Sequence, residues 1–143
     1  MTARLPISSI LENLDSDSPR FVSILDKIIN TVVNIMNNAE ELKEELIGYD
    51  DIYQTYVTDA NFNYWLEVSD GKLLYGKGVN SKALFSIHFT KNIILQILKN
   101  QVSGTDAFMK GKIKVEGSLS QGFRYIKLFR LIEKYLIEKN GNG

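Results

Sequence analysis

The sequence predicts an α+β fold in which helices cover one face of a mainly antiparallel sheet. Up to Tyr49 the apolar residues recur every three or four positions, as in amphipathic helices, and after it they recur every second position, as in strands. Each predicted strand alternates apolar with polar side chains, so one face should be packed and the other wet. A length of 143 residues argues for one domain with one core.

Two helices are expected at the start of the chain. Apolar residues spaced by three and four predict a short helix over 7–14, which ends at the polar run 15–17. Ser18 is expected to cap a second helix that begins at Pro19. Its apolar stripe over 21–36 should face the core.

A third helix is expected directly after the second. The paired Asn37 and Asn38 suit a left-handed stop, and Asn38 with Glu41 resembles a capping box. Leu42, Leu46 and Ile47 should face inward. The acidic run 40–45 is interpreted as a solvated helix face rather than an acid/base pair, because nothing near it predicts the burial that raises a pKa.

Four strands are expected in the middle of the chain, over 52–59, 62–69, 72–78 and 83–89. Asp70-Gly71 is a dipeptide preferred in two-residue hairpins, so the third strand should return antiparallel to the second. These segments therefore predict a meander followed by a fourth strand.

The last third of the chain is expected to alternate helix and strand. Thr90 is a plausible cap for a helix that runs through Asn100. Gly104 and Thr105 predict a short turn, and 112–117 alternates as a fifth strand. A final helix is expected over 119–138, before a frayed tail.

Composition excludes several classes of protein. The chain has no cysteine and one histidine. A disulfide framework, a Cys-based metal site and a His-cluster metal site are therefore not expected, and no cofactor is expected either. No run of residues is long and apolar enough for a signal peptide or a membrane span, which favours a cytoplasmic protein. The net charge of zero combines −9 over residues 1–70 with +9 over 71–143. These opposite charges either complement each other within one fold or give a basic face for an anionic partner.

Candidate catalytic and nucleic-acid sites are weak. Ser86 and His88 share the polar face of one predicted strand, but no orienting carboxylate or oxyanion donor is predicted beside them. A solvated histidine is therefore favoured. An enzyme that uses His88 is kept as a hypothesis, ranked third after the two stated at the end of this subsection. The aromatic residues of the final helix have the spacing of a packed core, so nucleic acid is not expected as a partner.

The final helix is more apolar than one buried stripe requires. Ten of the fifteen residues over 123–137 are aliphatic or aromatic. Four explanations are open: core packing, an oligomer interface, a face that touches membrane, and one wall of a cavity for an apolar ligand.

One segment before the final helix carries a family resemblance. Residues 107–118, AFMKGKIKVEGS, follow the Thr90-capped helix and precede the final helix. The segment resembles the signature of the sterol carrier (nonspecific lipid-transfer) family, and the order of predicted elements around it is also similar to that of this family. This resemblance implies a five-stranded mixed sheet covered on one face by helices, with an apolar tunnel that holds a fatty acid, an acyl-CoA, a phospholipid or a sterol.

The resemblance also implies where the tunnel lies. The family's tunnel region maps onto seven residues here: Phe108, Met109, Ile113, Val115, Leu119, Phe123 and Ile126. The alternation of the fourth strand and the following helix adds four more: Phe85, Ile87, Ile94 and Leu98. Three basic residues are available for an anionic head group or membrane surface: Arg124, Lys127 and Arg130.

The leading hypothesis is a non-enzymatic carrier of a fatty-acyl or similar lipid. Burial of a chain contributes about 0.8 kcal/mol per methylene, so no catalytic group is needed for binding. A helical extension over 1–37 is expected to pack on a lipid-binding domain over 38–139, followed by a disordered tail over 140–143. The alternative is a homodimeric interaction or accessory module that uses the apolar final helix.

Overall fold

The computed structural model describes residues 14–141, and side chains through residue 135. Its elements in chain order are α2 (Phe21–Asn37), η1 (Glu40–Leu42), α3 (Lys43–Leu46), β1 (Asp51–Val57), β2 (Phe62–Ser69), β3 (Lys72–Lys77), β4 (Phe85–Phe89), α4 (Lys91–Leu98), α5 (Gly104–Met109), β5 (Lys114–Gly117) and α6 (Leu119–Gly141). The helix predicted over 7–14 lies outside the described residues, apart from Leu14, which is buried.

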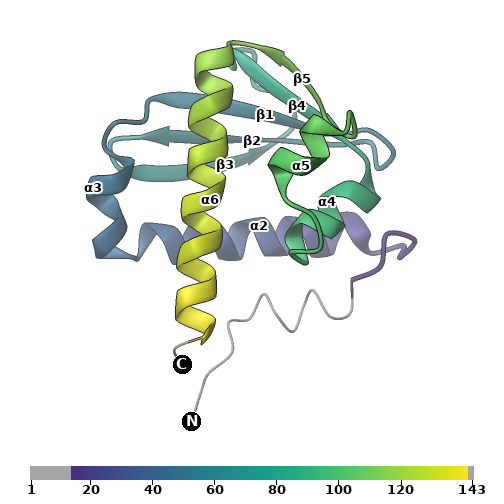
Figure 1. Cartoon of the computed structure of the whole chain (residues 1–143), viewed down its shortest axis with the longest axis horizontal. Coiled ribbons are helices and arrows are strands. Elements are labelled where there is room, and N and C mark those ends of the chain that lie inside the picture. Colours follow the sequence, from purple (N-terminus) through teal and green to yellow (C-terminus); the bar gives the residue numbers. More distant parts are fainter. Residues whose placement is uncertain (1–13, 142–143) are drawn as a thin grey trace.

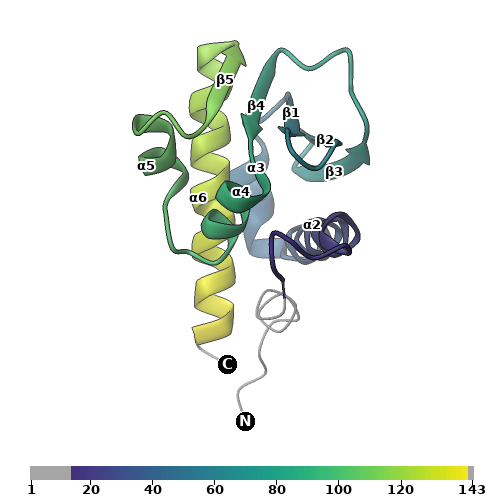
Figure 2. The ribbon, with the colours of Figure 1, turned by 90° about the vertical axis from the view of Figure 1, so that its right-hand side faces the viewer.

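The five strands form one mixed sheet in the order β3-β2-β1-β4-β5 (Figure 1). Strand β4 runs parallel to β1, and the other neighbours are antiparallel. The connection from β3 to β4 crosses the face of the sheet opposite α2 (Figure 2). The predicted α+β class with a five-stranded mixed sheet is confirmed.

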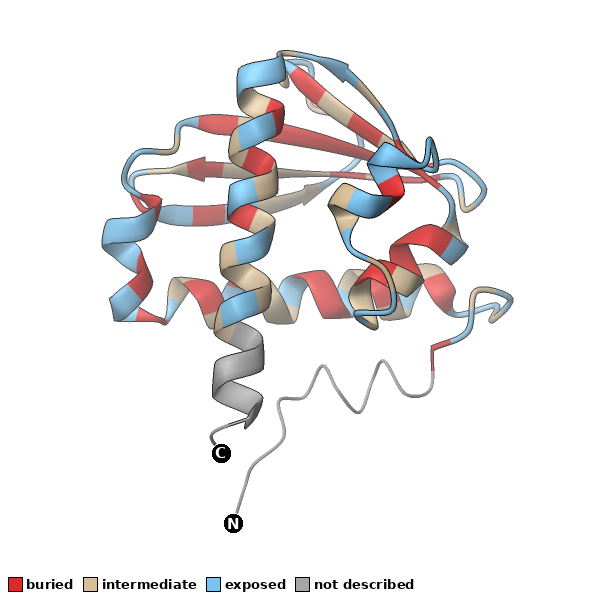
Figure 3. Ribbon diagram, in the orientation of Figure 1, coloured by how far each residue is buried: buried red, intermediate tan, exposed pale blue. Residues whose placement is uncertain are grey.

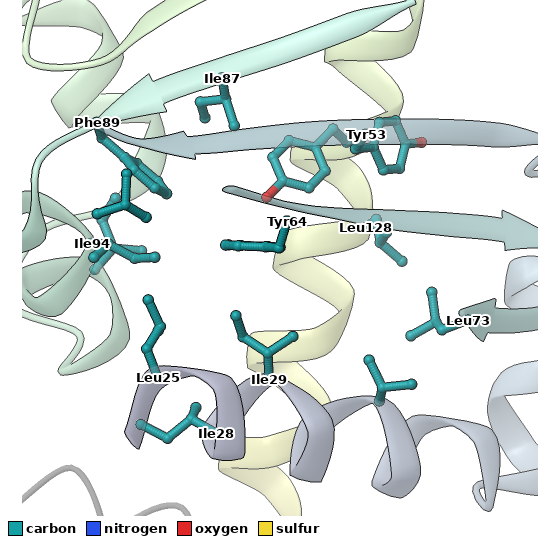
Figure 4. Close-up of a cluster of buried hydrophobic side chains, with 14 of the residues drawn as sticks. Leu25, Ile28, Ile29, Tyr53, Tyr64, Leu73, Ile87, Phe89, Ile94 and Leu128 are labelled. Atoms are coloured by element: carbon teal, nitrogen blue, oxygen red, sulfur yellow. The ribbon is translucent and has the colours of Figure 1, made fainter. Parts of the chain in front are cut away.

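The helices lie on one face of the sheet and bury its apolar side chains (Figures 2 and 4). Helix α2 contributes six buried residues, among them Leu25 and Ile29, and α6 contributes Leu128. Tyr53, Tyr64 and other side chains of the inner sheet face meet them. The amide of Asn37 both donates to the Leu73 carbonyl oxygen and accepts from the Leu73 backbone N–H, at 2.8 Å each, which fixes α2 to β3.

The Asp70-Gly71 hairpin is confirmed. Both residues have positive φ, 52° and 74°, as a two-residue hairpin turn with right-handed strand twist requires. The turn sets the pairing of Val68 with Leu73 and so places both side chains in the core.

The outer face of the sheet is mixed rather than fully wet. Gln54 points to this face, yet it is only 2% exposed, because the β3–β4 connection covers it. Its amide donates to the Tyr64 and Gly78 carbonyl oxygens at 3.0 Å and accepts from the Asn80 backbone N–H at 2.8 Å. The buried amide of Gln54, with all three bonds made, holds the β3–β4 connection against the sheet.

Three predicted helix signals are wrong. Pro19 lies in a turn, and α2 begins only at Phe21 with Arg20 as its N-cap, so the hydroxyl of Ser18, which accepts from the Arg20 backbone N–H, lies ahead of the helix. Asn38 has φ −94°, not a left-handed value, and donates to the Asn34 carbonyl oxygen. No side chain caps η1, whose N-cap is Ala39, so the capping box does not form. The acidic side chains of η1 and α3 are exposed, as predicted. Leu42 and Leu46 are buried, but Ile47 is 66% exposed because α3 ends at Leu46, so its predicted inward position is wrong.

The predicted ends of the later elements need correction. The fourth strand begins at Phe85 rather than at residue 83, and the Ser118 backbone N–H donates to the Leu84 carbonyl oxygen one residue beyond the paired Phe85 and Gly117. The fifth begins at Lys114, because the Lys112 backbone N–H donates to the Ala107 carbonyl oxygen, which closes α5. The predicted turn at 104–105 is a helix, α5, and α4 ends at Leu98 rather than Asn100.

Helix α6 extends to Gly141, beyond the predicted end at Glu138. It crosses the sheet in front of α2 (Figure 1). Within residues 14–141, no helix combines the length and the apolar character that crossing a bilayer requires.

Candidate functional site

An apolar pocket of about 200 Å³ lies between α6 and the β4–β5 end of the sheet, with α5 at its side. The sheet contributes Phe85, Ile87, Phe89 and Val115. Helix α6 contributes residues at helical spacing from its first turn to its fourth: Leu119, Gly122, Phe123, Tyr125, Ile126, Phe129, Arg130 and Glu133. The pocket therefore follows the axis of α6.

Two glycines bring the walls of the pocket together. Gly117 has φ +97°, and a Cβ there would lie 2.2 Å from the Leu84 carbonyl oxygen, so only glycine fits the turn from β5 into α6. A Cβ on Gly122 would lie 2.8 Å from the ring of Phe85. The missing side chain at Gly122 lets α6 approach β4 closely at the wall of the pocket.

Eight of the eleven side chains expected in a tunnel lie around this pocket: Phe85, Ile87, Phe108, Ile113, Val115, Leu119, Phe123 and Ile126. The other three lie elsewhere. Ile94 is buried in the core and Leu98 packs against that core, while Met109 is 77% exposed and outside the lining.

Several lining residues were missed by sequence reasoning. Phe89, Ile97 and Phe129 are apolar residues at the right spacing, so the periodicity could have found them. The polar lining residues carry no comparable signal: Ser103 and Thr105 because α5 was expected to be a turn, and Glu133 because a charged residue on the final helix is expected in solvent.

The pocket opens to solvent beside exposed apolar side chains. Phe108, Leu119 and Phe123 all line it, yet they are 45%, 71% and 69% exposed. The expectation that Phe123 packs in the core is therefore wrong. Its position on α6 places it at the rim, while Tyr125 and Leu128 fill the core.

The far end of the pocket is polar. The guanidinium of Arg130 donates from Nη2 to the Thr105 hydroxyl at 3.1 Å, which links α6 to α5. Glu133, one helical turn later, also lines the pocket. Burial raises the pKa of Glu133, and the positive charge of Arg130 partly opposes this shift. An anionic group would find both a cation and a hydroxyl here.

Arg124 is committed to a different contact. Its Nε and Nη2 donate to the two carboxylate oxygens of Asp51 at 2.6 and 2.9 Å, and the Tyr53 hydroxyl donates to the same carboxylate at 2.8 Å. Burial alone would raise the pKa of Asp51, but the hydrogen bonds from Arg124 and Tyr53 outweigh it and lower that pKa. Arg124 was expected to be available for a head group, and this pairing corrects the expectation. Lys127 is exposed and outside the lining of the pocket.

One buried hydroxyl also borders the pocket. Burial raises the pKa of Tyr125 to about 12, and a hydrogen bond with Thr55 opposes part of the shift. Tyr125 is therefore neutral at physiological pH. It packs with its ring centroid 4.7 Å from that of Tyr53.

His88 lies on the outer face of the sheet, away from the pocket. Its ring stacks on Tyr56 with centroids 4.6 Å apart, and Nε2 lies 3.0 Å from Glu116 Oε1 and 3.5 Å from the Ser86 hydroxyl. Both contacts use the same ring nitrogen, whereas a relay needs the carboxylate on one nitrogen and the nucleophile on the other. The described residues also hold no cluster of acidic and histidine side chains that could bind a metal ion.

The fold and the pocket define a small α+β domain with an apolar binding site. The sequence matches the SCP-2 sterol transfer family over residues 29–130. The chain belongs to this family, which is a family of lipid-binding and lipid-transfer domains. The match begins within α2. Comparison with curated protein sequences finds no match.

Solved structures share the fold at low identity. Sterol carrier protein 2 from Yarrowia lipolytica, in its apo form, has a TM-score of 0.58 and 19% identity, covering 76% of this chain and 89% of that one. The sterol carrier protein domain 2 of Helicoverpa armigera has a TM-score of 0.59 and 16% identity, covering 82% and 94%.

A larger enzyme carries a similar domain. The sec-alkylsulfatase Pisa1 from Pseudomonas sp. has a TM-score of 0.59 and 18% identity, covering 78% of this chain and 17% of that one. The chain thus spans about one sixth of the length of the alkylsulfatase it matches. These likenesses establish the fold alone.

Proposed function

We propose that this protein is a non-enzymatic carrier that binds one acyl chain of an anionic lipid, such as a fatty acid or a fatty-acyl conjugate, in the pocket beside α6. The observation that carries the proposal is the shape of the pocket. Its lining follows α6 from Leu119 to Glu133, which at 1.5 Å per residue is about 21 Å. A long and narrow apolar site suits an extended chain.

The volume favours a single chain over bulkier lipids. Pockets for small molecules have volumes of roughly 300–1,000 Å³. A pocket of about 200 Å³ is too small for a sterol ring system or for two acyl chains without rearrangement. We therefore expect α5, in which only Ala107 is buried, to move outward when a long chain binds.

The polar end of the pocket suits an anionic head group. Arg130 supplies a cation and Thr105 a hydroxyl, and the two already contact each other. Of the three basic residues expected to meet a head group, Arg130 lines the pocket, while Arg124 and Lys127 do not. We assign the head group to Arg130 and the chain to the apolar side chains between it and Phe123.

Chain burial supplies enough free energy without covalent chemistry. Eight buried methylenes contribute roughly 6 kcal/mol. Each named apolar residue is then a wall of the site and none is a catalyst.

A cytoplasmic location stays a prediction of the sequence, as do the domain boundaries at 37/38 and 139/140.

The test is lipid content and uptake. Solvent extraction and mass spectrometry of the purified protein should find single-chain lipids. A fatty acid that carries a dansylamino label and a free carboxylate should bind and be displaced by unlabelled fatty acid. Val115→Phe fills part of the pocket, so the bound acyl chain should bury about two methylenes fewer. Binding of the labelled fatty acid should then weaken about 10-fold or more.

The matched control is Leu74→Phe, the same kind of enlargement on exposed β3, outside the lining of the pocket. It should leave binding unchanged. An extract without lipid together with no displacement, or equal effects of the two substitutions, would contradict the proposal.

A further inference from the structure

One exposed stripe of α6 changes from apolar to basic along its length. Leu119, Phe123, Lys127, Arg130 and Lys134 are separated by three or four residues, so they share one face, and all five are exposed. Between Leu119 and Lys134 the one acidic residue is Glu133, which is half-buried and lines the pocket beside Arg130. We refer to these five residues as the α6 stripe.

The α6 stripe forms one rim of the pocket. Leu119, Phe123 and Arg130 belong both to the stripe and to the lining. Across the opening, the end of α5 presents Phe108 and Met109, which are 45% and 77% exposed. Figure 3 shows these exposed bands on α5 and along α6 on one side of the molecule. Four large apolar side chains therefore project into solvent around one opening.

Charge is also concentrated around this opening. Residues 104–130 contain six basic and two acidic side chains. Of the six, Arg124 is paired with Asp51, and Lys110 and Lys112 are exposed in the loop that follows α5. The acidic side chains of η1 and α3 are exposed on the other side of α6 from α5 (Figure 1). An anionic surface would attract the face with the opening and repel the opposite one.

We propose that the α6 stripe and the end of α5 form a docking surface for an anionic lipid bilayer, with the pocket opening against the membrane. Exposed apolar side chains enter the boundary between head groups and acyl chains, and the basic residues contact lipid phosphates, as in interfacial amphipathic helices. This inference rests on the proposed function, because it takes the pocket as the site of an acyl chain. Docking would let that chain pass from the membrane into the pocket without crossing water. A second copy of this chain fits the surface less well, since it would bring basic residues together.

The test is sedimentation with vesicles of phosphatidylcholine alone and of phosphatidylcholine with an equal amount of phosphatidylglycerol. The protein should bind the anionic vesicles and bind neutral vesicles at least about 10-fold more weakly. Lys127→Glu/Lys134→Glu, whose two sites lie outside the lining, should lower the affinity for anionic vesicles by at least about 10-fold. Phe123→Ser should also lower it, through loss of the inserted side chain.

The matched control is Lys72→Glu/Lys82→Glu, which makes the same change of charge at exposed positions outside this surface and should retain vesicle binding within about twofold. Equilibrium binding of the labelled fatty acid is measured without vesicles on the same proteins, and Lys127→Glu/Lys134→Glu should weaken it by no more than about 5-fold, because both sites are exposed and outside the lining. Slower transfer of the fatty acid from anionic vesicles to this variant would support docking.

Three results would overturn the inference. The first is an equal loss of binding to anionic vesicles in the two charge-reversal variants. The second is no binding of the wild-type protein to anionic vesicles. The third is a dimer in light scattering that Phe123→Ser dissociates. If vesicle binding fails while fatty acid still binds, the docking surface is wrong and the proposed function stands. If fatty acid fails to bind, the proposed function is wrong whatever the vesicles show.

Discussion

Asp51 and Arg124 show how a single contact decides the role of a residue. Arg124 is basic, lies on the final helix, and is close in sequence to residues that line the pocket, so it resembles a head-group ligand. The structure instead shows both of its nitrogen donors on the buried carboxylate of Asp51, 73 residues earlier. A pairing between residues so far apart depends on the packing of α6 against β1, which local sequence patterns do not report.

We predict that Arg124→Met destabilises the fold and that the effect depends on pH. The pKa of Asp51 is lowered in the folded state from 3.8, so the stabilising contribution is present above that value and lost as the pH falls through the lower folded pKa. The difference in urea midpoint between wild type and Arg124→Met should therefore be largest at neutral pH and shrink in acid.

The control for this prediction is Lys127→Met, an exposed position one turn later on the same helix. It should change stability by no more than about 0.5 kcal/mol at any pH. A difference between wild type and Arg124→Met that is constant from neutral pH into acid would mean that Asp51 is not the partner that matters.

Glu133 gives a second prediction, on ligand affinity. Its carboxylate lies in the pocket near Arg130, and burial raises its pKa. If an anionic head group binds at Arg130, the negative charge of Glu133 opposes it. Glu133→Gln should then bind the labelled fatty acid roughly 2- to 5-fold more tightly at neutral pH.

Acidification should strengthen fatty-acid binding to wild type more than to Glu133→Gln, because protonation of Glu133 removes the same charge. The titration of the ligand is common to both proteins. Glu44→Gln, which removes a charge from the exposed acidic face, should leave affinity unchanged. Weaker binding by Glu133→Gln would place the head group elsewhere.

Helix α5 is the weakly packed wall of the pocket. It has six residues, one of them buried, and its first turn is held by the Ser103 hydroxyl, which accepts from the Asp106 backbone N–H at 2.9 Å. We predict that Ser103→Ala destabilises α5 locally by about 1 kcal/mol. Amide hydrogen exchange should become faster in α5 and stay the same in β1, and the labelled fatty acid should enter more quickly.

The matched control is Thr90→Ala, which removes the equivalent cap of α4, where the hydroxyl accepts from the Ile93 backbone N–H at 3.3 Å. It should speed exchange in α4 and leave the rate of fatty-acid entry unchanged. If both variants speed entry equally, general loosening rather than α5 controls access.

The elements also show what sequence reasoning can reach. Periodicity and the Asp70-Gly71 turn were enough to place five strands and the helices α4 and α6, though not their ends, because these signals are local. The existence of α5 was missed, because it depends on the cap at Ser103 and on the Lys112 backbone N–H, which donates to the Ala107 carbonyl oxygen. Asn38 was misread for a related reason, since its amide bonds back to the helix instead of ending it in a left-handed turn.

The whole molecule combines a conventional core with one opening in it. Most apolar residues of the sheet's inner face are buried, whereas Phe108 of α5 and Leu119 and Phe123 of α6 are left exposed around the pocket. The excess of apolar residues in the final helix indicated that some side chains would serve more than core packing. Phe123 lines the pocket whereas Leu128 only packs in the core. This difference follows from the angle at which α6 meets the sheet, which the helical period of the sequence does not determine.

The polar end of the pocket could not be predicted from the sequence in the same way. Thr105 and Arg130 are separated by 25 residues and meet only because α5 folds beside α6. Their contact makes the pocket amphipathic, and this feature supports a lipid with an anionic head group over a wholly apolar ligand.

The decisive measurement is the location of a fatty acid brominated in mid-chain, determined by anomalous diffraction from crystals of the complex. We predict one bromine site between β4 and α6, within contact of Phe85, Val115 and Ile126, with the carboxylate toward Arg130. A bromine site on the outer face of the sheet, or a complex in which the pocket stays empty, would contradict the assignment of this pocket as the lipid site.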